Sequence, residues 1–340
     1  MKAVVLEAVH QPLVVKDVPV PTIGAQDVLI RVQACGTCHT DLHISEGMLV
    51  PFGVNRFPLI PGHEVTGIID RVGAQVTHLK PGDRVGVYFV FGCGHCPYCV
   101  AGEDENCTTF WTGSRLSGFS LDGGYAEYMR APADCVMRLP EELNFVDASP
   151  LFCAGLTMYG GIKNGGYRPG QRVAVLGIGG LGHLGLQIAN AMGAEVIAVT
   201  ATEAKRELAH QLGAHHVIVG TGGDVGPQLR ALGGADVVLS TTLDTQLIAG
   251  SMQGMATEGA LVLTAVTMES IPVVPALLLG FQHRIVGSLV GSRRDMQELL
   301  QLAAKHNIRP MTEVYPLEQA NEVHARLRAQ QVRFRAVLTP

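Results

Sequence analysis

The chain has 340 residues, of which 47% are hydrophobic, and a formal net charge of −5 from 25 Lys and Arg against 30 Asp and Glu. At roughly 150 residues per domain the length predicts two domains with substantial cores. The chain has no basic stripe, which argues against a nucleic-acid partner, and no apolar run of the ~20 residues that span a bilayer. The N-terminus lacks a signal-peptide pattern, so we expect a cytoplasmic protein.

Residues 1–150 have the pattern of an irregular, β-rich domain. Short apolar runs occur at 2–6, 28–32, 67–69 and 84–88. Turn-forming pairs such as Pro61-Gly62 and Asp122-Gly123 separate such runs. Runs of this kind between Gly, Pro and Asp predict short strands rather than helices.

From about residue 151, apolar strand patterns alternate with helical ones. We predict strands at 172–176, 195–199, 235–239, 260–263 and 284–286, and helices at 181–192 and 203–212. This alternation implies right-handed crossovers and a parallel, doubly wound sheet. Two further helices are predicted near the C-terminus, at 293–306 and 317–330.

Eight cysteines are present, and four of them lie within fifteen positions: Cys93, Cys96, Cys99 and Cys107. In a reducing cytosol such a cluster indicates metal ligands before disulfides. Four thiolates at this short spacing suit a closed, tetrahedral structural zinc, which would stabilise its lobe without taking part in chemistry. The alternative is a set of reduced surface thiols.

A glycine-rich loop follows the strand predicted at 172–176. It consists of Gly177, Ile178, Gly179, Gly180, Leu181 and Gly182, and a helix is expected after it. Between a strand and a helix this pattern predicts a dinucleotide site: Gly177 permits the tight turn, Gly179 lets the backbone approach a pyrophosphate, and Gly182 lets the helix pack closely. The helix N-terminus then offers N–H groups to the phosphates. A glycine-rich turn without a ligand is the alternative.

The residue at the end of the second predicted strand bears on the choice of cofactor. An NAD site expects an acidic residue there, but the chain has Thr200. Without that carboxylate, the hydroxyls of Thr200 and Thr202 and the charge of Lys205 or Arg206 are available to a 2′-phosphate. We therefore favour NADP(H) over NAD(H). Glu203 counts against this, and the two basic residues are alternatively a solvated helix face.

Several further motifs extend over nearly the whole chain. They are Cys38-His39-Thr40-Asp41-Leu42-His43, Gly62-His63-Glu64, Cys153-Ala154-Gly155-Leu156-Thr157 and Val286-Gly287-Ser288. Together with the four-cysteine and glycine loops, they make the chain similar to the zinc-dependent alcohol dehydrogenases of the medium-chain dehydrogenase/reductase superfamily. The segment from Thr200 resembles the NADP-dependent cinnamyl alcohol dehydrogenase branch.

The resemblance implies catalytic zinc ligands Cys38, His63 and Cys153, with a fourth position open. It further implies a carboxylate beside the zinc at Glu64 and an orienting group for His63 at Asp41. Thr40 and His43 match the proton relay of the family, and His39 matches a residue near the cofactor pyrophosphate. Val266 is placed among the cofactor contacts, while Phe89 and Trp111 are expected to line the substrate pocket. Cys35 and Cys135 have no assigned role.

The implied architecture is a Rossmann domain of residues 151–287 inserted into a GroES-like, zinc-binding catalytic domain of residues 1–150 and 288–340. We expect the active site in the cleft between the domains, two zinc ions per chain, and a homo-oligomer, dimer or tetramer, formed partly through the last strand of the sheet. The implied reaction is reversible hydride transfer between a primary or secondary alcohol or aldehyde and NAD(P)(H). The alternatives are a polyol or formaldehyde dehydrogenase, a noncatalytic cofactor-binding relative, and a zinc-stabilised interaction module.

Overall fold

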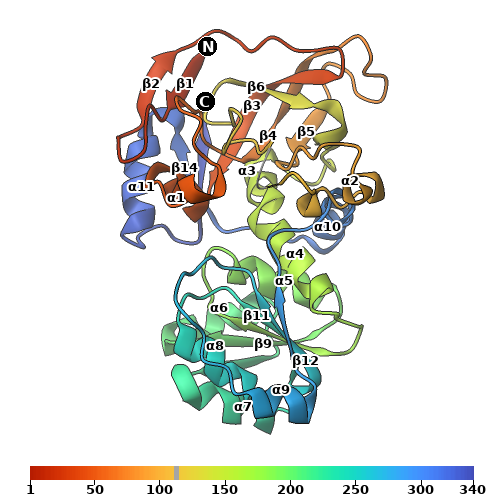
Figure 1. The fold of residues 1–340 in the computed structure, drawn as a ribbon, viewed down its shortest axis with the longest axis vertical. Helices are drawn as coiled ribbons and strands as arrows, with labels where there is room; N and C mark the ends of the chain where they lie inside the picture. Colours follow the sequence, from red (N-terminus) through yellow and green to blue (C-terminus); the bar gives the residue numbers. More distant parts are fainter. Residues whose placement is uncertain (111–114) are drawn as a thin grey trace. The chain divides into compact units, whose positions relative to one another are not determined.

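The computed structural model describes residues 1–110 and 115–340. Contacts divide the chain into two compact units (Figure 1). Unit 1 comprises Met1–Cys153, Ser292–Ala304 and Arg309–Pro340, and unit 2 comprises Ala154–Gly291 and Lys305–Ile308. Among the helices in the described ranges, none has the length and apolar character needed to cross a bilayer.

Unit 2 contains a six-stranded, entirely parallel sheet. Its strands are β8 (Arg172–Leu176), β9 (Glu195–Thr200), β10 (His216–Val219), β11 (Ala235–Ser240), β12 (Met255–Leu263) and β13 (Arg284–Gly287). They lie in the order β10-β9-β8-β11-β12-β13. Counted from β8, this is the order 3-2-1-4-5-6 of the dinucleotide-binding Rossmann fold. The predicted doubly wound sheet is confirmed.

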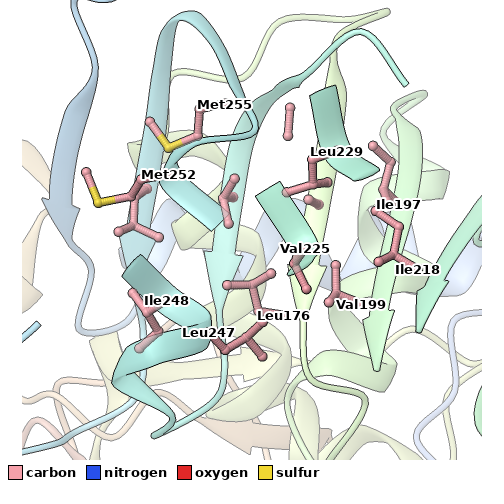
Figure 2. Packing of buried hydrophobic residues seen from close by; sticks show 14 residues of the cluster. Leu176, Ile197, Val199, Ile218, Val225, Leu229, Leu247, Ile248, Met252 and Met255 are labelled. Atoms are coloured by element: carbon pink, nitrogen blue, oxygen red, sulfur yellow. The ribbon is translucent and has the colours of Figure 1, made fainter. Parts of the chain in front are cut away.

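Helices cover both faces of this sheet. They are α4 (Ala154–Asn164), α5 (Gly182–Ala191), α6 (Arg206–Gln211), α7 (Val225–Ala231), α8 (Thr245–Met252) and α9 (Pro275–Phe281). On β8, Val175 faces Gly185 of α5, whereas Leu176 points to the opposite face. There Leu176 belongs to a buried cluster with side chains of α7 and α8 (Figure 2). Because both faces are covered, β8 is a continuous apolar run.

Three predictions about unit 2 need correction. The strand predicted at 260–263 begins earlier, because β12 covers Met255–Leu263. Strand β10 was not predicted, although three of its four residues, Val217, Ile218 and Val219, form a short apolar run after His216. The helix predicted at 203–212 begins as a 3₁₀ turn, Glu203–Lys205, and becomes α-helical only at Arg206. By contrast, the predicted bounds of β8 agree with the structure.

Unit 1 is β-rich, as predicted. A small sheet pairs β1 (Lys2–Val5) with β2 (Val14–Asp17). The main sheet contains β3 (Asp27–Thr37), β4 (Glu64–Val72), β5 (Arg84–Val87), β6 (Tyr128–Pro132), β7 (Val136–Arg138), β14 (Thr312–Pro316) and β15 (Arg335–Thr339). Its order is β14-β15-β3-β4-β5-β7, with β6 also paired to β3.

The α-helices of unit 1 are α1 (His39–Ser45), α2 (Pro97–Ala101), α3 (Phe145–Ala148), α10 (Arg293–His306) and α11 (Ala320–Arg328). The last two residues of α10 are assigned to unit 2. The bounds predicted for α10 agree with the structure, because its apolar stripe and polar face follow the helical period clearly. The helix predicted at 317–330 has a 3₁₀ turn at Leu317–Gln319 before α11.

The register of the main sheet gathers three strand ends at one place. Gly36 of β3 pairs with Glu64, the first residue of β4, and Thr37 of β3 pairs with Ala336 of β15. Cys38 directly follows β3, and His63 directly precedes β4. Residues far apart in the sequence are therefore neighbours at this end of the sheet.

Candidate active site

The carboxylate of Asp41 connects the end of β3 to the segment that enters β4. Asp41 lies in the first turn of α1 and is only 1% exposed. Its Oδ2 accepts a hydrogen bond from the Cys38 backbone N–H at 2.8 Å, and its Oδ1 accepts one from the Gly62 N–H at 3.2 Å. Oδ1 also lies 3.4 Å from His63 Nδ1. One buried side chain thus holds Cys38 and His63 in relation to each other.

The ring of His63 is held by two phenylalanines. Its centroid lies 5.2 Å from that of Phe89 and 5.0 Å from that of Phe119, and the two phenyl rings stack on each other at 5.7 Å. Phe89 therefore packs beside His63, and its assignment to the substrate pocket stays a prediction. Phe119 was missed, because no motif marks its segment. Trp111, the other predicted lining residue, lies outside the described residues.

Glu64 pairs with Gly36 of β3, and the absence of a side chain on Gly36 leaves space for the Glu64 carboxylate. A Cβ on Gly36 would lie 1.9 Å from Glu64 Oε2, so any other residue at this position of β3 would displace the carboxylate. The other carboxylate oxygen, Oε1, accepts a hydrogen bond from Arg335, and both side chains are at most 3% exposed. Arg335 was not predicted as a site residue, since a single arginine near the C-terminus carries no signal of its own.

Four metal-binding side chains converge here: Cys38, His63, Glu64 and Cys153. One potential ligand atom from each lies within 4.8 Å of the other three. In this cluster, both ring nitrogens of His63 and Oε2 of Glu64 are buried without a hydrogen-bond partner among the described residues. Buried polar atoms are normally satisfied, so this pair indicates a missing partner. Two thiols, one imidazole and a nearby carboxylate suit a zinc ion with an open position.

The electrostatics of the cluster favour a thiolate at Cys38. The neighbouring Cys153 thiol, together with His63 and Arg335, holds the pKa of Cys38 well below its usual range. Burial opposes a charged His63, but the Asp41 carboxylate outweighs it and raises the pKa of this imidazole. Burial raises the pKa of Glu64 to about 7, although Arg335 acts in the opposite direction. Thiolate ligands are what a zinc site requires.

The residues assigned to the proton relay lie on α1. Cys38 Sγ and Thr40 Oγ1 are 3.5 Å apart, which places the hydroxyl beside the cluster. Thr40 and His43 are three positions apart and therefore share a face of the helix, and His43 is half-buried. His39, at the first position of α1, is exposed.

The second cysteine cluster has the dimensions of a closed zinc site. One Sγ from each of Cys93, Cys96, Cys99 and Cys107 lies within 4.8 Å of the other three. The Cys93–Cys99 and Cys96–Cys107 sulfur distances are 3.9 and 4.0 Å. Tetrahedral Zn–S bonds of ~2.3 Å would separate the sulfurs by ~3.8 Å. Backbone N–H groups, foremost that of Cys99, lower the pKa of Cys96 to about 6, which favours its thiolate.

A partly buried ion pair connects the four-cysteine segment to α10. Asp104, 3% exposed, pairs with Arg293, and Arg293 Nη1 also donates to the Asp134 carbonyl at 3.1 Å. Neither Asp104 nor Arg293 was predicted to have a role.

In unit 2, the glycine loop has the geometry that its pattern predicted. Gly177 has a φ of +90°, which favours glycine. A Cβ on Gly182 would lie 1.9 Å from the Gly177 carbonyl oxygen, so α5 packs directly on the turn. A Cβ on Gly179 would meet nothing within 4 Å, and Gly179 is exposed. Gly180 and Leu181 follow at the start of α5. The loop is thus open where a pyrophosphate would approach.

Of the residues assigned to the adenosine side of the cofactor, Lys205 contacts the glycine loop directly. Lys205 Nζ donates to the Ile178 carbonyl at 2.8 Å. Thr200 is 4% exposed, and its Oγ1 accepts from the Thr202 N–H at 3.3 Å. Arg206 pairs instead with Glu203. Val266 is 51% exposed in the segment after β12, and its assignment to the cofactor stays a prediction.

The chain matches two family models. Residues 24–141 match the alcohol dehydrogenase GroES-like domain, and residues 180–305 match the zinc-binding dehydrogenase domain. An alcohol dehydrogenase from Geobacillus stearothermophilus is 43% identical over 344 residues, covering 99% of each chain. A relative named a probable formaldehyde dehydrogenase, from Bacillus subtilis (strain 168), is 37% identical over 92% of this chain and 89% of its own length.

The fold agrees with these relationships. The alcohol dehydrogenase from the archaeon Aeropyrum pernix, 32% identical, superposes with a TM-score of 0.89 over the full length of both chains. A Rossmann sheet, a GroES-like unit and two clusters of zinc-binding side chains together define a zinc-binding oxidoreductase. The chain belongs to the zinc-dependent alcohol dehydrogenases of the medium-chain dehydrogenase/reductase superfamily. Its substrate is accordingly a small molecule, and its cofactors are zinc and a nicotinamide dinucleotide.

The four-cysteine cluster generates a prediction about stability. Replacing Cys96 with alanine should lower the thermal unfolding temperature by about 5–10 °C, because a closed zinc site contributes folding free energy. Turnover per correctly folded chain should stay within about twofold. Cys135→Ala is the matched control, since Cys135 is a buried cysteine of the same unit outside the cluster. An unfolding temperature for Cys96→Ala equal to that of this control would refute a structural role.

Proposed function

We propose that Cys38, His63 and Cys153 hold the catalytic zinc of an enzyme that transfers hydride between a primary or secondary alcohol or aldehyde and NAD(P)(H). The observation that carries this is the convergence of Cys38, His63 and Cys153, whose potential ligand atoms lie within 4.8 Å of one another, with both ring nitrogens of His63 buried and unpartnered among the described residues. When bound, zinc supplies a Lewis acid for the substrate oxygen, and the nicotinamide accepts or donates the hydride. The expected location of the site in a cleft between domains stays a prediction.

The chain's own residues then account for positioning and proton transfer. Asp41 Oδ1 lies 3.4 Å from Nδ1 of His63, so Nδ1 faces the carboxylate and Nε2 is the ring nitrogen available to the metal. Thr40 Oγ1, beside the Cys38 sulfur, takes the proton of the substrate hydroxyl while it gives up its own toward His43, a transfer in which the cofactor ribose would take part when bound. His43, half-buried on the same face of α1, passes that proton to solvent.

The assignments predict a graded series of variants. Cys38→Ala and His63→Ala should abolish turnover but leave cofactor binding intact, because the glycine loop belongs to another unit. Thr40→Ala should lower turnover by about 10²-fold or more, and His43→Ala less, since water can replace the outer relay member. Steady-state rates and fluorescence titration with NAD(P)H measure both quantities. Full turnover by either ligand variant would contradict the site.

Two substrate candidates within this class can be compared directly by their rates. The relative named as a probable formaldehyde dehydrogenase makes formaldehyde a second candidate beside longer primary alcohols. Initial rates with a panel of alcohols and aldehydes, formaldehyde included, separate the two. The highest kcat/KM with formaldehyde would favour the second candidate.

For the cofactor we propose NADP(H) in preference to NAD(H). At the end of β9, Thr200 stands where an NAD site would present a carboxylate, so no charge at that position repels a 2′-phosphate. Lys205 is held close to the loop by its contact with Ile178, and its ammonium retains further donors.

Lys205→Met tests this choice. Loss of a charge-assisted contact should weaken NADPH binding about tenfold and NADH binding less than about twofold. Arg206→Met is the matched control, because Arg206 is already paired with Glu203 and donates to the Val217 carbonyl. If the ratio of the two dissociation constants is the same in Lys205→Met as in wild type, Lys205 does not select the 2′-phosphate.

We further propose that the chain assembles as a homodimer or tetramer through unit 2. Strand β13 is an edge of the sheet and pairs only with β12 among the described strands. Apolar side chains are exposed around it: Ile285 by 39%, Leu289 by 48%, and Leu279 of α9 by 84%. An open edge with an apolar flank is a surface that a second copy of the chain can pair with.

Charge placed in this patch should weaken the assembly. Sedimentation velocity should show a dimer or tetramer for wild type and a shift toward monomer for Leu279→Lys. Leu243→Lys, at a leucine 57% exposed elsewhere in unit 2, should leave the distribution unchanged. A monomeric wild-type protein would refute the proposal.

A further inference from the structure

Four consecutive carbonyl groups at the start of the glycine loop accept hydrogen bonds from side chains. Thr241 Oγ1 donates to the carbonyls of Leu176 and Gly177, at 2.8 and 3.1 Å. Lys205 Nζ donates to that of Ile178 at 2.8 Å. His183 Nδ1 lies 2.9 Å from that of Gly179. The carbonyl side of the loop is therefore fixed by three residues from three different parts of unit 2.

This arrangement determines where the N–H groups point. In a trans peptide the N–H is directed opposite to the carbonyl of the same peptide plane. The N–H groups of Ile178, Gly179 and Gly180 are consequently turned away from the side chains that hold the carbonyls. Gly179 is exposed and has open space where a Cβ would stand. Successive N–H groups on an open side form a concave anion site.

Of the three side chains that hold the loop carbonyls, His183 makes two hydrogen bonds to one oxygen atom, that of Gly179. The side chain is 0% exposed and lies in the first turn of α5. A carbonyl oxygen only accepts, so Nδ1 must carry the proton. The Gly179 oxygen also accepts the backbone N–H of His183 at 3.1 Å, and both of its lone pairs are thus used by one residue. Rotation of the Gly179–Gly180 peptide would break both bonds.

We propose that His183 is a positioning residue for the dinucleotide: its Nδ1–H fixes the Gly179–Gly180 peptide so that the Gly180 N–H is presented to the pyrophosphate. This rests on the proposed function, since it presumes that the loop binds the cofactor. Without the imidazole donor, the peptide is held only by the backbone bond and samples other orientations. Part of the affinity for the pyrophosphate is then spent on ordering it.

His183→Leu and His183→Asn form the test pair. Leucine keeps an apolar side chain of similar size but has no donor, whereas the amide of asparagine places a donor at the position of Nδ1. His183→Leu should raise the KM and dissociation constants of both NADH and NADPH about tenfold, because the pyrophosphate is common to both. The kcat at saturating cofactor and the KM of the alcohol should change less than about twofold. His183→Asn should stay within about threefold of wild type for the better cofactor.

A matched control is available in the same unit. His210 Nδ1 also lies 2.9 Å from a carbonyl, that of Ala214, at the end of α6 and away from the loop. His210→Leu should leave the cofactor constants unchanged, and thermal unfolding of all variants reports any general loss of stability. Unchanged cofactor constants in His183→Leu, or equal weakening in His183→Leu and His183→Asn, would overturn the inference. Failure of the wild-type protein to bind either dinucleotide would instead overturn the proposed function.

Discussion

The Asp41 carboxylate makes contacts with three separate backbone or ring groups while almost entirely removed from water. It accepts the N–H groups of Cys38 and Gly62 and faces Nδ1 of His63. A carboxylate with several donors in a buried environment is strongly localised, because any movement would leave a charge without partners. The positions of two proposed zinc ligands depend on this one side chain. The third, Cys153, arrives from the short segment between the 3₁₀ helix Ser149–Phe152 and α4.

Glycine makes the same arrangement sterically possible. Gly36 leaves space for the Glu64 carboxylate in the sheet of unit 1, and Gly182 allows α5 to approach the turn at Gly177 in unit 2. In both places a methyl group would fall within 2 Å of an oxygen atom. In both units, therefore, a glycine lets an oxygen atom lie closer to the backbone than a Cβ atom would allow: the Glu64 carboxylate at Gly36 and the Gly177 carbonyl at Gly182. The glycine loop is further fixed by side-chain donors on its carbonyls.

Features with a local signal could be predicted from the sequence. The four-cysteine loop, the glycine loop and α10 are each contained in one short segment with a characteristic spacing or period. Features that depend on distant pairing could not be predicted. Arg335 reaches Glu64 only because β15 and β4 both flank β3, and Thr241 reaches the glycine loop only because β11 lies beside β8. Phe119 meets His63 from a segment without any recognised pattern. The family resemblance indicated which residues act together, whereas the sheet register explains how they meet.

The central claim is that Cys38, His63 and Cys153 bind a metal ion independently of the four-cysteine cluster. Zinc content per chain, measured by plasma mass spectrometry after exhaustive dialysis of wild type and Cys153→Ala, tests it most directly. The account predicts about two zinc ions per wild-type chain and about one per Cys153→Ala chain, because the closed site has four other ligands. One zinc ion or none in the wild type, or two retained in Cys153→Ala, would contradict it.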